Sequence, residues 1–419
     1  EFIVEATKMA QANGYKDIAE IEKLQPGDKI YFINRGKSMY LAIIGTENIE
    51  NGVHIIGSHV DSPRLDLKPN PLYEDTELAY FKTHYYGGIK KYQWTTIPLS
   101  IHGVIVKPNG EKMTVNIGED DDDPIFTITD LLPHLAQEQM EKKLKNGIDG
   151  EDLNLLIGSI PYQDTDAKEK VKLNILNILN QKYGIVEADL QSSELEIIPA
   201  FKARSLGFDA GLVAAYGQDD KVCAYTSLAA IMTLENVKNT AVCILSDKEE
   251  IGSMGNTGME SHMFDFFISE MLNKLGVNRP NLLDKVFCFS KMLSSDVDAG
   301  FDPIYASVSD KTNAGYVGKG ISLNKYTGAR GKSGASDANA EYVAWVRNVL
   351  EKNDIKYQVA ELGKVDIGGG GTIAYILANK GTDVIDCGVP VLSMHAPYEV
   401  TSKFDIYSAF ETYKAFWKE

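Results

Sequence analysis

The sequence predicts an α/β protein, in which a catalytic sheet domain with helices on both faces is interrupted by a smaller, β-rich inserted domain. Near both ends of the chain, apolar runs of strand length alternate with helical segments, which is typical of open α/β sheets. The middle of the chain instead combines hairpin-like strands with charged helical stretches. The predicted boundaries are 1–92 and 205–419 for the catalytic domain and 93–204 for the insertion.

The first part of the chain begins with a helical segment over residues 5–14, EATKMAQANG, which ends at a glycine. The runs YFINR and LAIIG alternate or are continuously apolar, as strands are. The run VHIIG then stops abruptly at the polar residues of SHVDSP. We expect this run to be the first buried strand of the sheet.

The predicted insertion contains a hairpin whose turn is Asn109 and Gly110, within WTTIPLSIHGVIVKPNGEKMTVNIG. A second strand is expected at ELEIIPAF. Between them lie two charged helical stretches, EQMEKKLKNGI and KEKVKLNILNILNQKYG. After Gly217 the α/β alternation returns, with helices expected at VCAYTSLAAIMTLENV and ASDANAEYVAWVRNVLEK and strands at TAVCILS, KVFCFS, TDVIDCG and PVLSMH.

Composition excludes several classes of protein. With 419 residues, of which 44% are hydrophobic, the chain can bury a full core. A formal charge of −17 and the lack of a concentrated basic segment argue against a nucleic-acid partner. No run of about 18 apolar residues is present, and the first residues lack a signal-peptide pattern. We therefore predict a soluble, cytoplasmic protein without a membrane partner.

The four cysteines are far apart in the sequence and lie in apolar runs. They lack both the CxxC spacing of a structural zinc site and the density of a disulfide framework. We expect all four to be buried free thiols.

Two distant segments carry polar residues directly after an apolar run. His59 and Asp61 follow VHIIGS, and Glu249 and Glu250 follow CILSDK. Catalytic side chains of α/β sheets lie at such strand ends. A metal-activated hydrolase needs imidazole and carboxylate ligands and a separate base. We interpret His59 and Glu250 as ligands, Asp61 as the partner of the second ring nitrogen of His59, and Glu249 as the base. The alternative for the glutamate pair is a helix N-terminus that favours acids.

Three further segments place candidate ligands at strand or helix ends. Asp219 and Asp220 precede a helix, where a carboxylate either caps the helix or bridges two ions. Asp296 follows the apolar run KVFCFSKML, and His395 follows PVLSM. Each segment is a weak indication alone, but several of them at the ends of one sheet favour a metal site.

These residues and their neighbours, taken in order, resemble a known family. The chain is similar to the binuclear metallo-aminopeptidases that include aspartyl aminopeptidase and yeast vacuolar aminopeptidase I. The resemblance spans nearly the whole chain and rests on GSHVDSPRLDLKPNP, YGG at residues 86–88, GQDDKVCAY, DKEEIGS, SSDVDAG and MHAPYEV.

The resemblance implies a specific set of roles. It places His59 and Asp296 on separate metals with Glu250 and His395, and it makes Asp219 the bridge between the two ions. It also makes Glu249 the general base and Asp61 the carboxylate that orients His59. The implied cofactors are two divalent ions per subunit, with zinc as the default and manganese or cobalt as alternatives. The implied substrates are peptides with a free N-terminus.

The resemblance also implies an assembly and two residues near the substrate. The inserted domain would mediate dimerisation, and dimers would build a tetrahedral homododecamer. Lys332 lies near the place where this family can hold a cation for an acidic side chain, although an exposed loop lysine is the plainer interpretation. His134 lies in a segment that resembles one reaching a neighbouring subunit's active site. Aspartyl-specific members have a further histidine where this chain has Glu138, so a broader or neutral preference is plausible.

Two rival functions remain at this point. A related two-metal carboxypeptidase or deacylase would use the same ligands and differ in its substrate contacts. A catalytically silent, peptide-binding scaffold would share the fold. The presence of every proposed ligand and of the base Glu249 argues against the scaffold.

Overall fold

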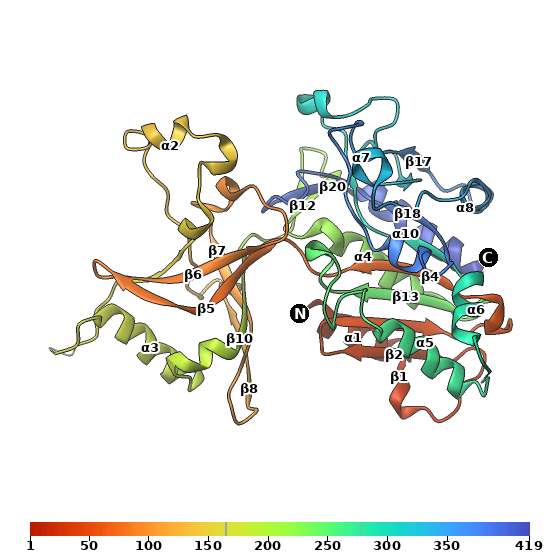
Figure 1. Cartoon of the computed structure of the whole chain (residues 1–419), viewed down its shortest axis with the longest axis horizontal. Coiled ribbons are helices and arrows are strands. Elements are labelled where there is room, and N and C mark those ends of the chain that lie inside the picture. Colours follow the sequence, from red (N-terminus) through yellow and green to blue (C-terminus); the bar gives the residue numbers. More distant parts are fainter. Residues whose placement is uncertain (164–165, 278) are drawn as a thin grey trace. The chain divides into compact units, whose positions relative to one another are not determined.

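The computed structural model describes residues 1–163, 166–277 and 279–419, and the chain forms two compact α/β units (Figure 1). Unit 1 comprises residues 1–62, 204–394 and 399–419, and unit 2 comprises residues 63–203 and 395–398. The α/β class is the predicted one. The predicted first boundary at residue 92 differs from the structure, in which unit 2 already begins at Pro63.

Unit 1 contains a nine-stranded sheet whose four central strands are parallel neighbours in the order β13-β4-β14-β18. Their carboxyl ends therefore meet at one edge of the sheet. The full order is β1 (Lys16–Asp17), β2 (Lys29–Asn34), β3 (Ser38–Ile43), β13 (Ala241–Ser246), β4 (His54–His59), β14 (Lys291–Ser294), β18 (Asp383–Gly388), β16 (Ile321–Asn324) and β17 (Tyr357–Ala360).

Helices cover both faces of this sheet, as its two separate hydrophobic clusters require (Figure 1). Strands buried on both faces are continuous apolar runs, and β13 and β4 are buried along their whole length. One cluster packs against α1 (Phe2–Ala12), α4 (Gln218–Met232), α8 (Ala340–Lys352) and α10 (Lys403–Lys418). The other packs against α5 (Met263–Lys274), α6 (Leu282–Phe289) and α9 (Ala374–Ala378).

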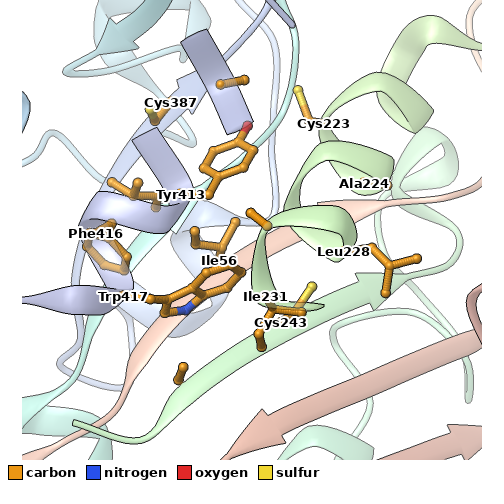
Figure 2. Close-up of a cluster of buried hydrophobic side chains, with 14 of the residues drawn as sticks. Ile56, Cys223, Ala224, Leu228, Ile231, Cys243, Cys387, Tyr413, Phe416 and Trp417 are labelled. Carbon is orange, nitrogen blue, oxygen red and sulfur yellow. The ribbon is translucent and has the colours of Figure 1, made fainter. Parts of the chain in front are cut away.

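The last helix anchors the first buried strand. Figure 2 shows Tyr413, Phe416 and Trp417 of α10 beside Ile56 of β4 and the side chains of α4. The indole N–H of Trp417 donates a hydrogen bond to the carbonyl oxygen of His54, at 3.0 Å. This contact ties α10 to the start of the strand that ends at His59.

A second, five-stranded sheet in unit 1 has the order β11 (Arg204–Leu206), β12 (Leu212–Ala215), β20 (Glu399–Ser402), β19 (Pro390–Leu392) and β15 (Asp298–Ala299). The short helix α7 (Ala329–Lys332) lies in a loop of the same unit. Across the described ranges of the chain, no helix has the length and apolar character needed to cross a membrane.

Unit 2 is built on an antiparallel sheet with the order β8 (Lys112–Ile117), β7 (Leu99–Val106), β10 (Ser193–Pro199), β5 (Arg64–Asp75), β6 (Leu78–Tyr86) and β9 (Leu155–Gly158). The strands β7 and β8 form the predicted hairpin. Strands β5 and β6 belong to this sheet because β5 pairs with β10, and this pairing moves the boundary to residue 63. Its helices are α2 (Gln137–Glu141) and α3 (Lys170–Tyr183).

Two predictions are wrong at one place in the chain. The run KVFCFS, predicted as a strand, belongs mostly to α6, and the strand β14 begins only at Lys291. A short apolar run does not distinguish a strand from a buried helix. In the helix, Val286 and Phe287 face the core while Cys288 faces outward, so Cys288 is exposed and not buried as predicted. The other three cysteines are buried and free.

Candidate metal centre

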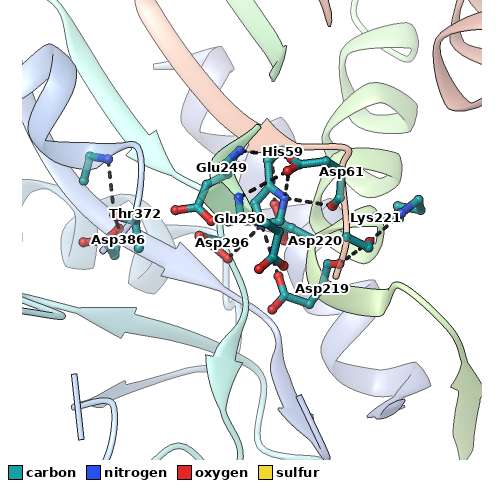
Figure 3. A network of polar contacts seen from close by, with 12 residues as sticks. His59, Asp61, Asp219, Asp220, Lys221, Glu249, Glu250, Asp296, Thr372 and Asp386 are labelled. Atoms are coloured by element: carbon teal, nitrogen blue, oxygen red, sulfur yellow. Dashed lines mark hydrogen bonds and ion pairs between the residues drawn. The ribbon is translucent and has the colours of Figure 1, made fainter. Parts of the chain in front are cut away.

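The candidate site lies where the parallel strands of unit 1 end. His59 is the last residue of β4, and Asp61 follows it. The turn Glu249–Ile251 follows β13, and Asp296 follows β14. Figure 3 shows these side chains converging at this edge of the sheet, together with Asp219 and Asp220. The crevice at the carboxyl ends of such strands is the usual ligand site of an α/β sheet.

His59 is the centre of the cluster and is 2% exposed. Its Nε2 atom lies 3.1 Å from Oδ1 of Asp219, 3.6 Å from Oδ1 of Asp296 and 3.9 Å from Oε2 of Glu249. Its Nδ1 atom lies 3.1 Å from the carbonyl oxygen of Asp61 and 3.3 Å from Oδ1 of the same residue. One ring nitrogen therefore faces three carboxylates, and the other faces Asp61.

Asp61 also fixes the turn that carries the two glutamates. Its Oδ1 atom accepts a hydrogen bond from the backbone N–H of Glu249 at 3.1 Å, and its Oδ2 atom accepts one from Glu250 at 3.2 Å. These bonds satisfy donors at the start of the turn that the turn itself leaves without partners. The sequence holds no signal for this contact, because it joins segments that are far apart in the chain.

Asp219 and Asp220 stand at the start of α4, in backbone conformations that are not helical. Both are buried, and a cis peptide bond joins them. Oδ2 of Asp220 accepts a hydrogen bond from the backbone N–H of His59 at 3.2 Å. The two carboxylates therefore do not simply cap the helix, which was one of the two interpretations of the sequence.

Among the residues that the structure describes, two groups have ligand atoms within 4.8 Å of one another: His59, Asp219 and Glu250, and His59, Asp220 and Asp296. Imidazole nitrogen and carboxylate oxygen suit zinc, and they also suit manganese or cobalt. Burying several carboxylates around one imidazole destabilises the folded protein unless a cation or protons balance their negative charge. The residues present therefore fit a divalent metal.

The ionisation of these groups agrees with that conclusion. Burial, and then the nearby charge of Asp296, raise the pKa of Glu249 well above its usual range. The same two causes raise the pKa of Asp220. Burial alone would lower the pKa of His59, but Asp296 and the other carboxylates hold it well above its usual range. Burial and mutual repulsion thus favour the protonated forms of these carboxyl groups, and a bound cation would oppose that protonation.

Each of the other three residues predicted at the site has its own surroundings. His395 groups by its contacts with unit 2, where its Nδ1 atom lies 2.8 Å from the carbonyl oxygen of Gly88. His134, also in unit 2, is exposed. The ammonium group of Lys332 lies 3.2 Å from both carboxylate oxygens of Asp337 and over the ring of Tyr326. The roles of these three residues stay predictions.

The glycine-rich run 368–372 is joined to the sheet through its last residue. The hydroxyl of Thr372 donates to Oδ1 of Asp386 on β18, at 2.7 Å, and accepts from the N–H of Ala374 (Figure 3). Burial raises the pKa of Asp386 to about 7. The sequence analysis did not identify Asp386, nor three residues that contact Asp219 and its neighbours: Ser62, Lys221 and Glu399.

Fold and site together define a metal-dependent hydrolase of the α/β class. Comparison with known proteins makes the assignment specific. A family model described as aminopeptidase I zinc metalloprotease (M18) matches residues 1–417, and the chain belongs to this family. By family it is therefore a metallo-aminopeptidase, as the resemblance implied, which argues against the carboxypeptidase, deacylase and silent-scaffold alternatives.

Close relatives support the family assignment. A probable M18 family aminopeptidase 1 from Clostridium acetobutylicum is 56% identical over 420 residues, covering 99% of this chain and 90% of the relative. The crystal structure of an M18 aminopeptidase from Thermotoga maritima is 44% identical, with a TM-score of 0.96, covering 99% and 92%. The mApe1 dodecamer of S. cerevisiae is 22% identical, with a TM-score of 0.79, covering 100% and 92%, and shows a shared fold.

Proposed function

We propose that this aminopeptidase hydrolyses the N-terminal peptide bond with two divalent metal ions, and that Glu249 is its general base. The ligands are His59, Asp219, Glu250, Asp296 and His395, and zinc is the proposed metal. The observation that carries the proposal is the different placement of the two adjacent glutamates. Glu250 belongs to a group of potential ligand atoms, whereas Glu249 belongs to neither group yet lies 3.9 Å from the imidazole of His59.

The distances favour one arrangement of the ions. Two ligand atoms about 2.0–2.1 Å from one tetrahedral ion are roughly 3.3 Å apart. Nε2 of His59 lies 3.6 Å from Asp296 and 3.1 Å from Asp219. We therefore propose that His59 and Asp296 share one ion, in place of the separate ions that the resemblance implied. Asp219 would bridge to a second ion held by Glu250, with His395 as its further ligand.

When bound, the ions would polarise the scissile carbonyl and lower the pKa of the attacking water. Glu249 takes the proton of that water and later gives it to the leaving amine. Burial and then the charge of Asp296 raise the pKa of the Glu249 carboxyl, and a raised pKa helps a carboxyl that acts first as a base and then as an acid. Asp61 accepts a hydrogen bond from the Glu249 backbone N–H and so fixes the backbone of the turn that carries the base.

For substrate preference, we propose a broad or neutral first residue in place of a strictly acidic one. The support comes from Lys332, whose ammonium group is already engaged by Asp337. A cation paired with a carboxylate attracts a second carboxylate less strongly. His134 stays a candidate substrate contact from a neighbouring subunit.

We further propose that unit 2 mediates dimerisation and that the assembly is a homododecamer, like that of the yeast relative. The segment around His134 exposes several large apolar side chains at half of their surface or more, which is typical of interaction sites. These side chains are Leu131, Leu132, Leu135, Met140 and Leu144. A cytoplasmic location stays a prediction.

Hydrolysis of aminoacyl-p-nitroanilides by metal-free protein resupplied with zinc, manganese or cobalt tests the proposed activity. The matched controls are the N-acetylated forms of the same substrates. We expect metal-dependent cleavage of the free amines alone. Cleavage of the acetylated forms would instead indicate a deacylase or an endopeptidase, and a strong preference for aspartyl and glutamyl substrates would contradict the proposed specificity.

A further inference from the structure

The backbone of Asp219 is held from both sides by buried polar side chains. Its N–H donates to Oε2 of Glu399 at 3.0 Å, and its carbonyl oxygen accepts from the hydroxyl of Ser62 at 2.7 Å. Ser62 and Glu399 are 2% and 1% exposed. Both contacts come from distant parts of the chain, so they fix Asp219 independently of its own helix.

A lysine completes one of these contacts. The ammonium group of Lys221 lies 2.6 Å from the hydroxyl oxygen of Ser62. An ammonium group carries only donors, so the Ser62 oxygen accepts from Lys221 and its single proton is left for the carbonyl of Asp219. Lys221 thereby fixes the direction of the Ser62 hydroxyl, and a charged donor makes the contact stronger than a neutral one.

Gly217 leaves the space that the side chains of Lys221 and Ser62 occupy. A Cβ atom on Gly217 would lie 2.9 Å from both Nζ of Lys221 and Oγ of Ser62. Gly217 also has φ +69°, a conformation that side chains rarely adopt. A glycine before the two aspartates is therefore required both by its own backbone and by the Lys221–Ser62 pair.

External support matters here because Asp219 lacks the restraint of a regular helix. Its φ and ψ are −76° and 107°, outside the helical region. Its side chain nevertheless has to bring Oδ1 to 3.1 Å from Nε2 of His59. A rotation of this backbone would move the carboxylate away from the other ligands.

We propose that Ser62 and Lys221 are positioning residues that aim the Asp219 carboxylate at the metal centre. This inference rests on the proposed role of Asp219 as the bridging ligand. Residues that orient a metal ligand typically change metal affinity about ten- to hundredfold when they are removed. Ser62 and Lys221 do so through the Asp219 main chain, without touching the metal.

Isothermal titration calorimetry of zinc into metal-free protein tests the inference, with the visible spectrum of the cobalt-loaded protein as a second readout. Ser62→Ala and Lys221→Met are each expected to weaken zinc binding about ten- to hundredfold and to shift the cobalt bands. Lys221→Arg keeps the charged donor and is expected to restore much of the affinity.

Ser290→Ala is the matched control. Ser290 is buried in unit 1, its hydroxyl donates to a carbonyl and accepts from an N–H, and it precedes β14 at the opposite end of the strand from Asp296. Its removal is expected to affect thermal unfolding but not zinc affinity or the cobalt spectrum. A general loss of packing would instead affect Ser290→Ala and Ser62→Ala alike.

Asp219→Ala separates the inference from the proposed function. If this variant binds zinc weakly while Ser62→Ala and Lys221→Met bind it as the unchanged protein does, the positioning role is overturned and the ligand role stands. If Asp219→Ala itself binds zinc normally, the ligand assignment fails, and the inference fails with it. Weak binding by all three variants, with a normal Ser290→Ala, supports both.

Discussion

Two adjacent glutamates receive different environments from one tight turn. Lys248 before them and Gly252 after them both have positive φ, at 66° and 90°, so the backbone reverses within a few residues. Asp61 holds the N–H groups of both glutamates. The strand-end pattern predicted that these side chains lie near His59. The turn and the contact with Asp61 could not be predicted in the same way, because they depend on tertiary structure.

Replacing each of the two glutamates by glutamine distinguishes the proposed base from the proposed metal ligand. Glu249→Gln removes the proton acceptor, so turnover should fall about 10²–10⁴-fold while zinc affinity is largely kept. Glu250→Gln is the matched control and should weaken zinc binding, because an amide is a poorer ligand than a carboxylate. The measurements are kcat and a zinc titration of each variant. Near-normal turnover by Glu249→Gln would show that another group is the base.

His54, a buried histidine at the opposite end of β4 from His59, is expected to make the free energy of unfolding depend on pH. Burial, and next the charge of Lys291, lower the pKa of His54 to about 4. The unfolded chain then binds more protons than the folded chain between about pH 6.5 and pH 4, so stability is lost as pH falls through this range. The loss is about 3 kcal/mol at 1.36 kcal/mol per pKa unit.

Chemical denaturation of metal-free protein from pH 7 to pH 4 measures this effect. His54→Leu should lose about 3 kcal/mol less than the unchanged protein over the range. His262→Leu, which removes an imidazole with a side chain 97% exposed, should behave like the unchanged protein. Equal losses in all three proteins would mean that His54 is not the group responsible.

At the scale of elements, close packing between strands positions the site. Gly388 ends β18, and a Cβ atom there would lie 1.6 Å from the carbonyl oxygen of Asp296. The strand therefore touches the backbone of a proposed ligand. Sequence periodicity predicted β4, β13 and β18, since apolar runs bounded by polar residues are a strong signal. It failed at α6, where a short apolar run is ambiguous, and it could not show which strands are neighbours.

Gly388→Ala should weaken both the fold and the metal centre. The backbone of Asp296 has to shift to admit the methyl group, at a cost of about 1–3 kcal/mol, as is usual for overpacking. Zinc affinity should fall as well, because Asp296 moves. Gly370→Ala is the control, since a Cβ atom there meets nothing within 4 Å. Denaturation curves and zinc titrations of both variants check this; similar zinc affinities would show that Asp296 tolerates the shift.

At the scale of the whole molecule, the sequence indicated two parts but misplaced their boundary. The hairpin β7–β8 and the helix α3 were predictable from turn residues and periodicity. Residues 63–92 were assigned to the wrong part, because strands β5 and β6 follow the site segment directly in sequence. The pairings of β5 with β10 and of β6 with β9 assign them to unit 2.

The proposed assembly gives a direct prediction of mass. Twelve copies of the 46.2 kDa chain weigh about 550 kDa, and light scattering after gel filtration should report this value. Replacing the exposed Leu135 and Leu144 by Glu should shift the mass toward smaller species, if their segment packs against another subunit. Glu replacements at the exposed Val359, in unit 1, control for charge alone. A monomer at all concentrations would contradict the proposed assembly.

The central claim is that two metal ions are held by His59, Asp219, Glu250, Asp296 and His395. Diffraction from zinc-loaded crystals at the zinc absorption edge tests it most directly. The account predicts two anomalous peaks about 3.5–4 Å apart, with Asp219 between them and with His59 and Asp296 on the same ion. A single peak, or two peaks away from these side chains, would contradict it.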